Sequence, residues 1–216
     1  MPNVIESNAR VFIGGKTGCG KSFLAETYLT GYEYVIKLDT KDETSERIAD
    51  GKSPWKGLKE GKDFTVVYFL DDLANCETKK IIYVPDITEQ NKETFDAFFK
   101  FVYMRENTVI WIDELMSIST SPLNYPFYMK ACYTRGRSKN IGIWALSQRP
   151  SDIPAIVLAN TEIFIVFALR LLADREKISK MTGCPEMLRM PTSEKHPYAF
   201  WYYEEEWNNP VLSELS

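Results

Sequence analysis

The stretch Gly14-Gly15-Lys16-Thr17-Gly18-Cys19-Gly20-Lys21-Ser22 decides the fold of this chain. From Gly15 onward it fits G-x-x-x-x-G-K-[ST], the pattern of a phosphate-binding loop. The glycines let backbone N–H groups turn toward the β-phosphate, and the helix that follows presents its N-terminus to the same anion. Lys21 is expected to reach the β- and γ-phosphates, and the Ser22 hydroxyl to coordinate Mg²⁺. We therefore predict ATP and Mg²⁺ as cofactors. The residues expected to bind them are Gly15, Lys16, Thr17, Gly18, Cys19, Gly20, Lys21, Ser22 and Phe23.

The chain around this loop alternates between strand and helix patterns. Strands are predicted at 10–13, 34–39, 65–69, 81–84, 109–112, 141–146, 162–168 and 199–203, and helices at 23–29, 90–103, 126–137 and 173–181. This alternation predicts an α/β fold with a largely parallel sheet that is covered on both faces. No internal repeat, low-complexity segment or linker interrupts it, so residues 1–216 are predicted to form one domain. The lysine- and glycine-rich segment 50–63 is predicted to be a surface excursion.

Composition excludes several classes of function. The chain of 216 residues carries a net charge of −4, so it has no overall basic character for nucleic acid, although a local basic patch stays open. Its four cysteines are far apart in sequence and its single histidine is His196, which argues against a zinc site or a disulfide framework. The longest apolar run, 163–169, is too short to span a bilayer, so we expect a soluble intracellular protein that does not cross a membrane.

A second motif indicates hydrolysis. The apolar stretch 109–112 ends in Asp113 and Glu114. Alternation along a strand points these two side chains in different directions, so they can have different roles. Asp113 is expected to hold the Mg²⁺ water shell, and Glu114 to polarise a water for in-line attack on the γ-phosphate. A kinase keeps water out and needs no such base.

A third motif lies at 133–150, where a basic helix end leads into a buried strand that finishes in Ser147-Gln148-Arg149-Pro150. Gln148, at the carboxyl edge of a strand beside the loop, is expected to sense the γ-phosphate or to position water. Arg135 and Arg137 are candidates to neutralise transition-state charge, provided that a neighbouring subunit donates them.

Together these motifs resemble the FtsK–HerA superfamily of DNA-pumping ATPases. Its members carry a phosphate loop, an apolar strand with Asp-Glu, and a strand that ends in Thr/Ser-Gln-Arg-Pro. The Asp39-x-Lys41-x-Glu43 stretch matches the Asp-x-Lys pattern of this superfamily, and the resemblance spans residues 11–169. It implies a RecA-like P-loop NTPase of the additional-strand, catalytic-glutamate type. It also favours Arg137 over Arg135 as the finger in trans, because relatives carry an arginine eleven residues before the glutamine.

The arrangement of motifs resembles that of the genome-packaging ATPases of membrane-containing double-stranded DNA viruses, since the loop begins almost at once and little follows the last predicted strand. The resemblance implies a ring, with a hexamer as the expected size, that pushes DNA into a preformed capsid. The implied partners are double-stranded DNA, bound without sequence specificity, and capsid or membrane-vertex proteins. The implied location is the host cytoplasm or the packaging vertex of the virion. Two basic clusters are candidates to track DNA: Lys52, Lys56, Lys59 and Lys62 around Trp55, and Lys130, Arg135, Arg137 and Lys139.

Other functions stay open at this point. A small cellular or plasmid translocase of the same superfamily would carry the same motifs. A nucleoside or nucleotide kinase would have a similar length, but Asp113-Glu114 and Ser147-Gln148-Arg149-Pro150 argue against it. A nucleotide-gated interaction protein with little turnover is a further alternative, against which Glu114 also argues. The aromatic stretch 198–203 alternates with period two, which favours a core or edge strand over a stacking platform for single strands.

Overall fold

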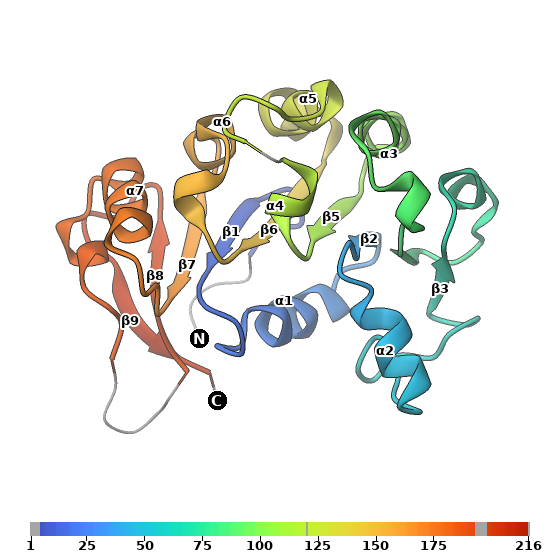
Figure 1. Cartoon of the computed structure of the whole chain (residues 1–216), viewed down its shortest axis with the longest axis horizontal. Coiled ribbons are helices and arrows are strands. Elements are labelled where there is room, and N and C mark those ends of the chain that lie inside the picture. The colour runs from blue at the N-terminus through green and yellow to red at the C-terminus, as the bar shows by residue number, and fades with distance from the viewer. Residues whose placement is uncertain (1–4, 120, 193–197, 216) are drawn as a thin grey trace.

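The computed structural model describes residues 5–119, 121–192 and 198–215, so His196 lies outside the described residues. Within them the fold is a nine-stranded sheet in the order β3-β4-β2-β5-β6-β1-β7-β8-β9 (Figure 1). The strands are β1 (Arg10–Gly14), β2 (Val35–Leu38), β3 (Phe64–Val67), β4 (Lys80–Tyr83), β5 (Val109–Ile112), β6 (Gly142–Ser147), β7 (Ile163–Phe167), β8 (Ala199–Glu204) and β9 (Val211–Glu214). The predicted α/β fold with a mainly parallel sheet is confirmed.

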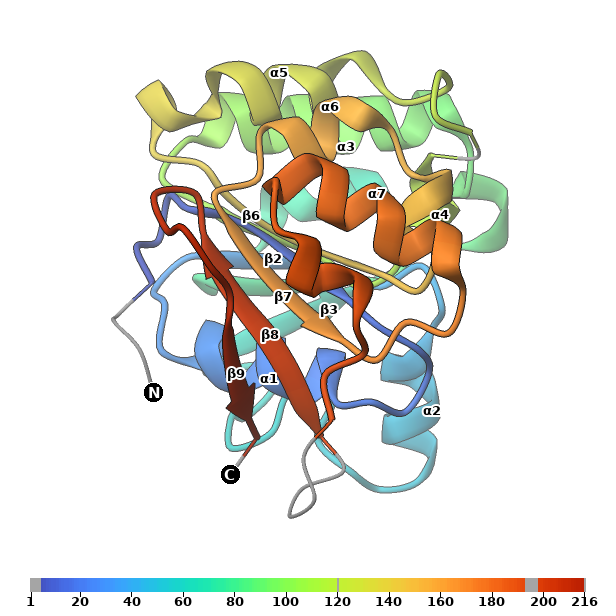
Figure 2. The same ribbon diagram turned by 90° about the vertical axis from the view of Figure 1, so that its left-hand side faces the viewer.

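Helices cover both faces of the sheet. They are α1 (Lys21–Thr30), α2 (Glu43–Ala49), α3 (Lys92–Arg105), α4 (Leu115–Ile118), α5 (Phe127–Arg135), α6 (Ala155–Ala159) and α7 (Leu172–Thr182). Figures 1 and 2 show α1 and α2 on one face and α3 to α7 on the other. The two apolar cores divide in the same way, since Leu24 and Leu29 of α1 pack in one and Phe98 and Met129 in the other. The molecule is therefore a three-layer sandwich.

The central strands are continuous apolar runs because both of their faces are buried. All five residues of β1 are buried, as are all four of β5. On α3, the predicted spacing of Phe95, Phe98, Phe99 and Val102 places these four side chains in the core. The helix begins after Asn91, whose side chain accepts a hydrogen bond from the N–H of Thr94.

Strand β6 lies between β1 and β5, and this order matters for the site. Gly14 of β1 is paired with Ser147 of β6, and Ile112 of β5 with Ala145 of β6. The parallel strands therefore bring the loop after β1, the acid pair after β5 and the residues after β6 to one edge of the sheet. This is the additional-strand arrangement that the resemblance implies.

The structure adds elements that the sequence patterns did not indicate. Helices α2, α4 and α6 are short and were not predicted. Strand β9 follows the aromatic strand β8, so β8 is not the last strand, and both run antiparallel to their neighbours. The expectation that the aromatic stretch forms a core or edge strand is confirmed, because Phe200, Tyr202 and Tyr203 are buried in β8.

The prediction that the segment 50–63 is a free surface excursion is wrong at Trp55. This side chain is fully buried, its ring lies 5.6 Å from that of Trp111, and its Nε1 donates a hydrogen bond of 2.9 Å to Thr30 Oγ1. The backbone N–H of Lys56 also donates to Glu26 Oε1 on α1. The lysines of the segment are exposed, but the segment that carries them is anchored on α1.

No helix among the described residues is long and apolar enough to cross a membrane.

Candidate active site

The loop after β1 is held on its neighbours by two backbone hydrogen bonds. The N–H of Gly15 donates to Ser147 O at 3.2 Å, and the N–H of Lys16 to Ala168 O at 3.1 Å. A Cβ on Gly15 would lie 2.6 Å from Cys19 Sγ and 2.7 Å from Phe167 Cβ, so only glycine fits there. The loop is therefore closed against the sheet edge.

The helix that follows is prepared for phosphate. Gly18 and Gly20 have φ angles of 74° and 97°, in the left-handed region that favours glycine. Helix α1 begins at Lys21, and no side chain caps its N-terminus. Its first N–H groups are thus left for an anion, which the helix dipole also favours. Cys19 is buried, and burial raises the pKa of its thiol, in keeping with the expected role of a loop residue.

Lys21 is folded back across the loop. Its Nζ donates to Gly15 O at 2.8 Å and to Lys16 O at 3.0 Å, and the residue is only 7% exposed. Burial lowers the pKa of its ammonium group. The side chain thus lies over the concave face of the loop, where the phosphates of a nucleotide would bind.

Ser22 and Asp113 meet at the predicted Mg²⁺ position. The Ser22 hydroxyl donates a hydrogen bond of 3.1 Å to Asp113 Oδ1. Asp113 is almost fully buried, and its Oδ2 has no hydrogen-bond partner among the described residues. Mg²⁺ prefers oxygen ligands and takes the rest of its shell from phosphate and water. The hydroxyl and the unpartnered carboxylate oxygen therefore fit this ion.

Glu114 is connected to the loop through Gln148. Gln148 Nε2 donates to Glu114 Oε2 at 3.2 Å, and Gln148 Oε1 accepts a hydrogen bond of 2.7 Å from Thr17 Oγ1. Glu114 is 7% exposed, and its Oε1 has no hydrogen-bond partner among the described residues. The structure thus brings Thr17, Gln148 and Glu114 into one chain of contacts beside the Ser22–Asp113 pair.

Lys41 completes this chain and was not among the predicted site residues. Its Nζ lies 3.2 Å from Glu114 Oε2. Burial lowers the pKa of Lys41, but the carboxylates of Asp113 and Glu114 outweigh it and the pKa is raised overall. Lys41 therefore stays charged beside Glu114. The Asp39-x-Lys41 spacing was the signal in the sequence, but it does not reveal which carboxylate the lysine meets.

Asp39 belongs to the framework behind the site. It is fully buried, and its Oδ2 accepts from Lys37 Nζ at 3.1 Å and from both the N–H and the hydroxyl of Thr44. Burial opposes ionisation, but Lys37 and Thr44 outweigh it and lower the pKa of the carboxyl. Asp39 thereby fixes the turn between β2 and α2, and Lys41 lies in this turn.

The comparison with protein families agrees with this arrangement. Residues 10–161, well over half of the chain, match the model of the AAA domain (dynein-related subfamily). The chain belongs to the AAA domain family. It is accordingly a P-loop ATPase. No curated protein sequence matches this AAA domain significantly.

Solved structures show which P-loop ATPases the AAA domain resembles in fold. The genome packaging NTPase B204 of Sulfolobus turreted icosahedral virus 2, in complex with ATP-gammaS, matches with a TM-score of 0.76 at 16% identity, over 97% of this chain and 98% of that chain. The DNA-packaging ATPase B204 of Sulfolobus turreted icosahedral virus matches with a TM-score of 0.73 at 19% identity, over 98% and 99% of the two chains. The pCW3 conjugation coupling protein TcpA matches with a TM-score of 0.55 at 13% identity, over 97% of this chain and 60% of that chain. The expected resemblance to packaging ATPases is thus confirmed at the level of the fold.

The two candidate arginines of the AAA domain lie away from this edge of the sheet. Arg137 precedes β6, and its NH1 lies 3.4 Å from Glu162 Oε1, which also pairs with Arg10 at the start of β1. The six residues of β6, at about 3.3 Å each, put roughly 20 Å between the two edges. Arg135 is exposed at the end of α5 and its side chain has no ion pair among the described residues. Neither arginine is brought to the loop of its own chain.

The two basic clusters lie on different parts of the AAA domain. In the first, Lys56 Nζ lies 5.2 Å from the centre of the Phe23 ring, next to the phosphate loop. In the second, Lys139 pairs with Glu106 beside the Tyr103 ring, and Arg137 pairs with Glu162. Lys56 of the first cluster is therefore near the site, and Arg137 and Lys139 of the second lie toward the opposite edge of the sheet.

Proposed function

We propose that this chain is an ATP-driven translocase of double-stranded DNA that packages a viral genome into a preformed capsid. The fold likeness to the packaging NTPase B204 over nearly the whole of both chains supports this proposal. The position of Glu114 carries the enzymatic part of it, because a buried carboxylate beside the Ser22–Asp113 pair is placed to act on water at the γ-phosphate. We treat residues 1–216 as one catalytic domain.

In the proposed reaction each residue of the site has a separate task. Lys21 leaves the loop carbonyls and binds the β- and γ-phosphates, while the N–H groups of the loop bind the β-phosphate. Ser22 and Asp113 would hold Mg²⁺, which would neutralise phosphate charge when bound. Glu114 takes the proton of the attacking water, and Gln148 positions that water between Glu114 and the loop.

Lys41 and Gln148 couple the proton acceptor to the nucleotide. Both contact the same oxygen of Glu114, so they hold its carboxylate to one side. Thr17 binds the other end of Gln148, which places this pair of contacts next to the γ-phosphate position. A γ-phosphate that contacts Thr17 and Gln148 would alter the hydrogen bond between Gln148 and Glu114. Glu114 would then be released to activate water only when a nucleoside triphosphate is bound.

The proposed assembly is a ring, with six subunits as the expected number. Arg137 lies at the edge of the sheet opposite the site, so it can act only on a neighbour. Head-to-tail contacts around a ring would set that edge against the next subunit's loop and leave a central channel. The basic clusters would contact DNA phosphates without reading sequence. Capsid or membrane-vertex proteins are the proposed further partners, and the host cytoplasm or the packaging vertex the proposed location.

A plasmid or cellular translocase is the second candidate, because the fold is also similar to that of the conjugation coupling protein TcpA. A nucleoside kinase is disfavoured, since a carboxylate positioned like Glu114 would activate water as the acceptor of the phosphoryl group.

The test is ATP hydrolysis by the full chain, with Mg²⁺ and with or without double-stranded DNA. Glu114→Gln should bind ATP with nearly unchanged affinity and lose at least about a hundredfold in kcat, the usual contribution of a general base. Glu93→Gln, an exposed glutamate on α3, is the matched control and should turn over normally. A DNA-stimulated rate that Glu114→Gln lacks would support the proposal. Normal turnover by Glu114→Gln would refute the assigned base, and phosphorylation of a nucleoside would favour the kinase.

A further inference from the structure

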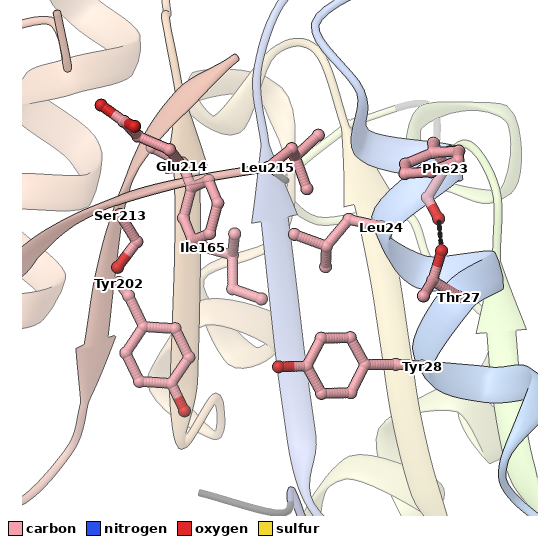
Figure 3. Close-up of a pocket in the computed structure, with 10 residues that line it drawn as sticks. Phe23, Leu24, Thr27, Tyr28, Ile165, Tyr202, Ser213, Glu214 and Leu215 are labelled. Carbon is pink, nitrogen blue, oxygen red and sulfur yellow. Dashed lines mark hydrogen bonds between the residues drawn. The ribbon is translucent and has the colours of Figure 1, made fainter. Parts of the chain in front are cut away.

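An apolar cleft lies between α1 and the antiparallel end of the sheet. Its volume is about 330 Å³, which falls within the range of small-molecule sites, about 300–1,000 Å³. Leu24 and Tyr28 line it from α1, Ile165 from β7, and Leu215 from the end of β9. Figure 3 shows these four side chains pointing into the same space, with Phe23 at its rim. No helix among the described residues covers this part of the sheet on the side of α1 (Figure 2).

The cleft is continuous with the phosphate loop. A second cavity of about 560 Å³ is lined by Gly20, Lys21 and Ser22 at the loop, and it shares Phe23 and Leu215 with the cleft. Leu215 lies directly on the loop, since a Cβ on Gly20 would come within 2.5 Å of its Cδ1. A ligand whose phosphates are bound at α1 can therefore extend past Phe23 and Leu215 into the cleft.

The walls of the cleft suit a flat aromatic ring with polar edges. Phe23 is 45% exposed at the rim. Lys56 Nζ lies 5.2 Å from the centre of its ring, so a base would stack on the other ring face. Tyr28 and Tyr202 lie at the far end, where Figure 3 shows the Tyr28 hydroxyl directed across the cleft. The Tyr202 hydroxyl donates to Glu204 Oε1, whereas the Tyr28 hydroxyl has no hydrogen-bond partner among the described residues. The apolar walls would bind a ring by contact, and Tyr28 would meet its edge.

We propose that this cleft binds the purine base of the nucleotide, stacked on Phe23, enclosed by Leu215 and hydrogen-bonded at its edge by the Tyr28 hydroxyl. The inference rests on the proposed ATP site and extends it to β7, β8 and β9. The antiparallel end of the sheet would then form half of the nucleotide site. Ile165 and Leu215, which are far from the phosphate loop in sequence, would then enclose the base that Phe23 and Tyr28 of α1 contact.

The experiment measures the binding of two probes, MgATP and inorganic magnesium tripolyphosphate, to the full chain by calorimetry. Tripolyphosphate occupies the loop but has no base. Phe23→Ala should weaken ATP binding by at least about fivefold, since stacking of a base on an aromatic ring contributes about that or more. Tyr28→Phe should weaken ATP binding about threefold, the loss of one neutral hydrogen bond. Both variants should bind tripolyphosphate as the wild type does. Phe127→Ala, which truncates a phenylalanine on α5 that is 68% exposed, should change neither affinity.

One further variant and one further probe keep the proposal open to refutation. Ser213→Trp would fill the cleft from β9, so it should weaken ATP binding without affecting the binding of tripolyphosphate. CTP, which has a smaller base, should bind to the wild type more weakly than ATP does. Equal losses for both probes, or unchanged ATP binding in all three variants, would overturn the inference. So would wild-type protein that binds ATP no more tightly than tripolyphosphate. Failure of the wild type to bind either probe would instead refute the phosphate site itself. Unchanged ATP binding with altered sedimentation would mean that the cleft is a surface for another chain.

Discussion

At the scale of single residues, Lys21 connects the structure of the loop to the binding of its proposed ligand. The ammonium group that would bind phosphate is buried and bonded to Gly15 O and Lys16 O. Burial lowers its pKa below the ordinary value of 10.5. Only the protonated form can pair with phosphate, so a bound phosphate would raise this pKa again. Nucleotide binding and protonation of Lys21 are thereby coupled.

ATP affinity should therefore decrease at alkaline pH. It should be highest below the lowered pKa of Lys21 and should fall as the pH rises through that pKa, and protons should be taken up when ATP binds in this range. The measurement is the Kd for ATP between about pH 7 and about pH 10, in buffers of different ionisation enthalpy. Lys21→Arg is the control, because a guanidinium does not titrate in this range. Equal pH profiles for the wild type and Lys21→Arg would contradict the coupling.

Lys41 should affect catalysis and leave binding nearly unchanged. It contacts Glu114 and not the phosphate loop, so Lys41→Met should lower kcat about tenfold and change KM for ATP by less than about twofold. Steady-state kinetics would measure both values. Lys180→Met, at an exposed lysine on α7, should be unaffected. A raised KM with normal kcat would show that Lys41 binds ATP instead of positioning Glu114.

At the scale of elements, the segment 50–63 is a support for α1 and not a free loop. Trp55 fills the space behind α1, against Trp111 and Thr30. Glu26 of α1 accepts from the N–H of Lys56 and forms an ion pair with Arg47. The helix that carries Lys21 and Ser22 is therefore held from behind by this segment.

Trp55→Ala should lower the free energy of unfolding by about 3–5 kcal/mol, as expected for removal of a fully buried aromatic side chain. Urea denaturation followed by circular dichroism would measure it. Phe69→Ala, an aromatic truncation at a residue that is 53% exposed, should cost less than about 0.5 kcal/mol. Equal stabilities for Trp55→Ala and the wild type would restore the interpretation as a free excursion.

The sequence was sufficient to predict strands β1 to β8 and the position of the acid pair. Loops and strand ends are local features, and parallel strands bring their carboxyl ends together whatever the details of packing. Trp55 could not be predicted, because its burial depends on Thr30 and Trp111, both distant in sequence. Strand β9 has only four residues, none of them buried, so it carries no apolar pattern. The contact between Lys41 and Glu114 likewise arises from two chain segments that only the sheet brings together.

At the scale of the whole molecule, the site and Arg137 lie at opposite edges of the sheet. One subunit therefore cannot contain both halves of the proposed reaction centre. The pairing of Arg137 with Glu162 holds the arginine at the far edge, where a neighbour would meet it. Catalysis should accordingly require contact between subunits.

Mixing two inactive variants should restore activity. A Glu114→Gln subunit keeps Arg137 and can complete the site of an Arg137→Ala neighbour, whose own Glu114 is intact. ATP hydrolysis by the mixture should exceed the sum of the separate rates, and Arg137→Ala alone should keep nearly normal ATP affinity. Arg135→Ala in place of Arg137→Ala is the control and should be active without mixing. A mixture no faster than the sum of its parts would place the finger elsewhere or in no subunit.

The contact of Leu215 with Gly20 has a practical consequence. A polypeptide attached after this residue would start beside the phosphate loop, so an affinity tag there would compete with the proposed nucleotide. A small environment-sensitive dye in the same place would instead change its emission each time ATP enters or ADP leaves. The end of β9 is therefore a poor position for an affinity tag and a good position for a fluorescent reporter of the nucleotide cycle.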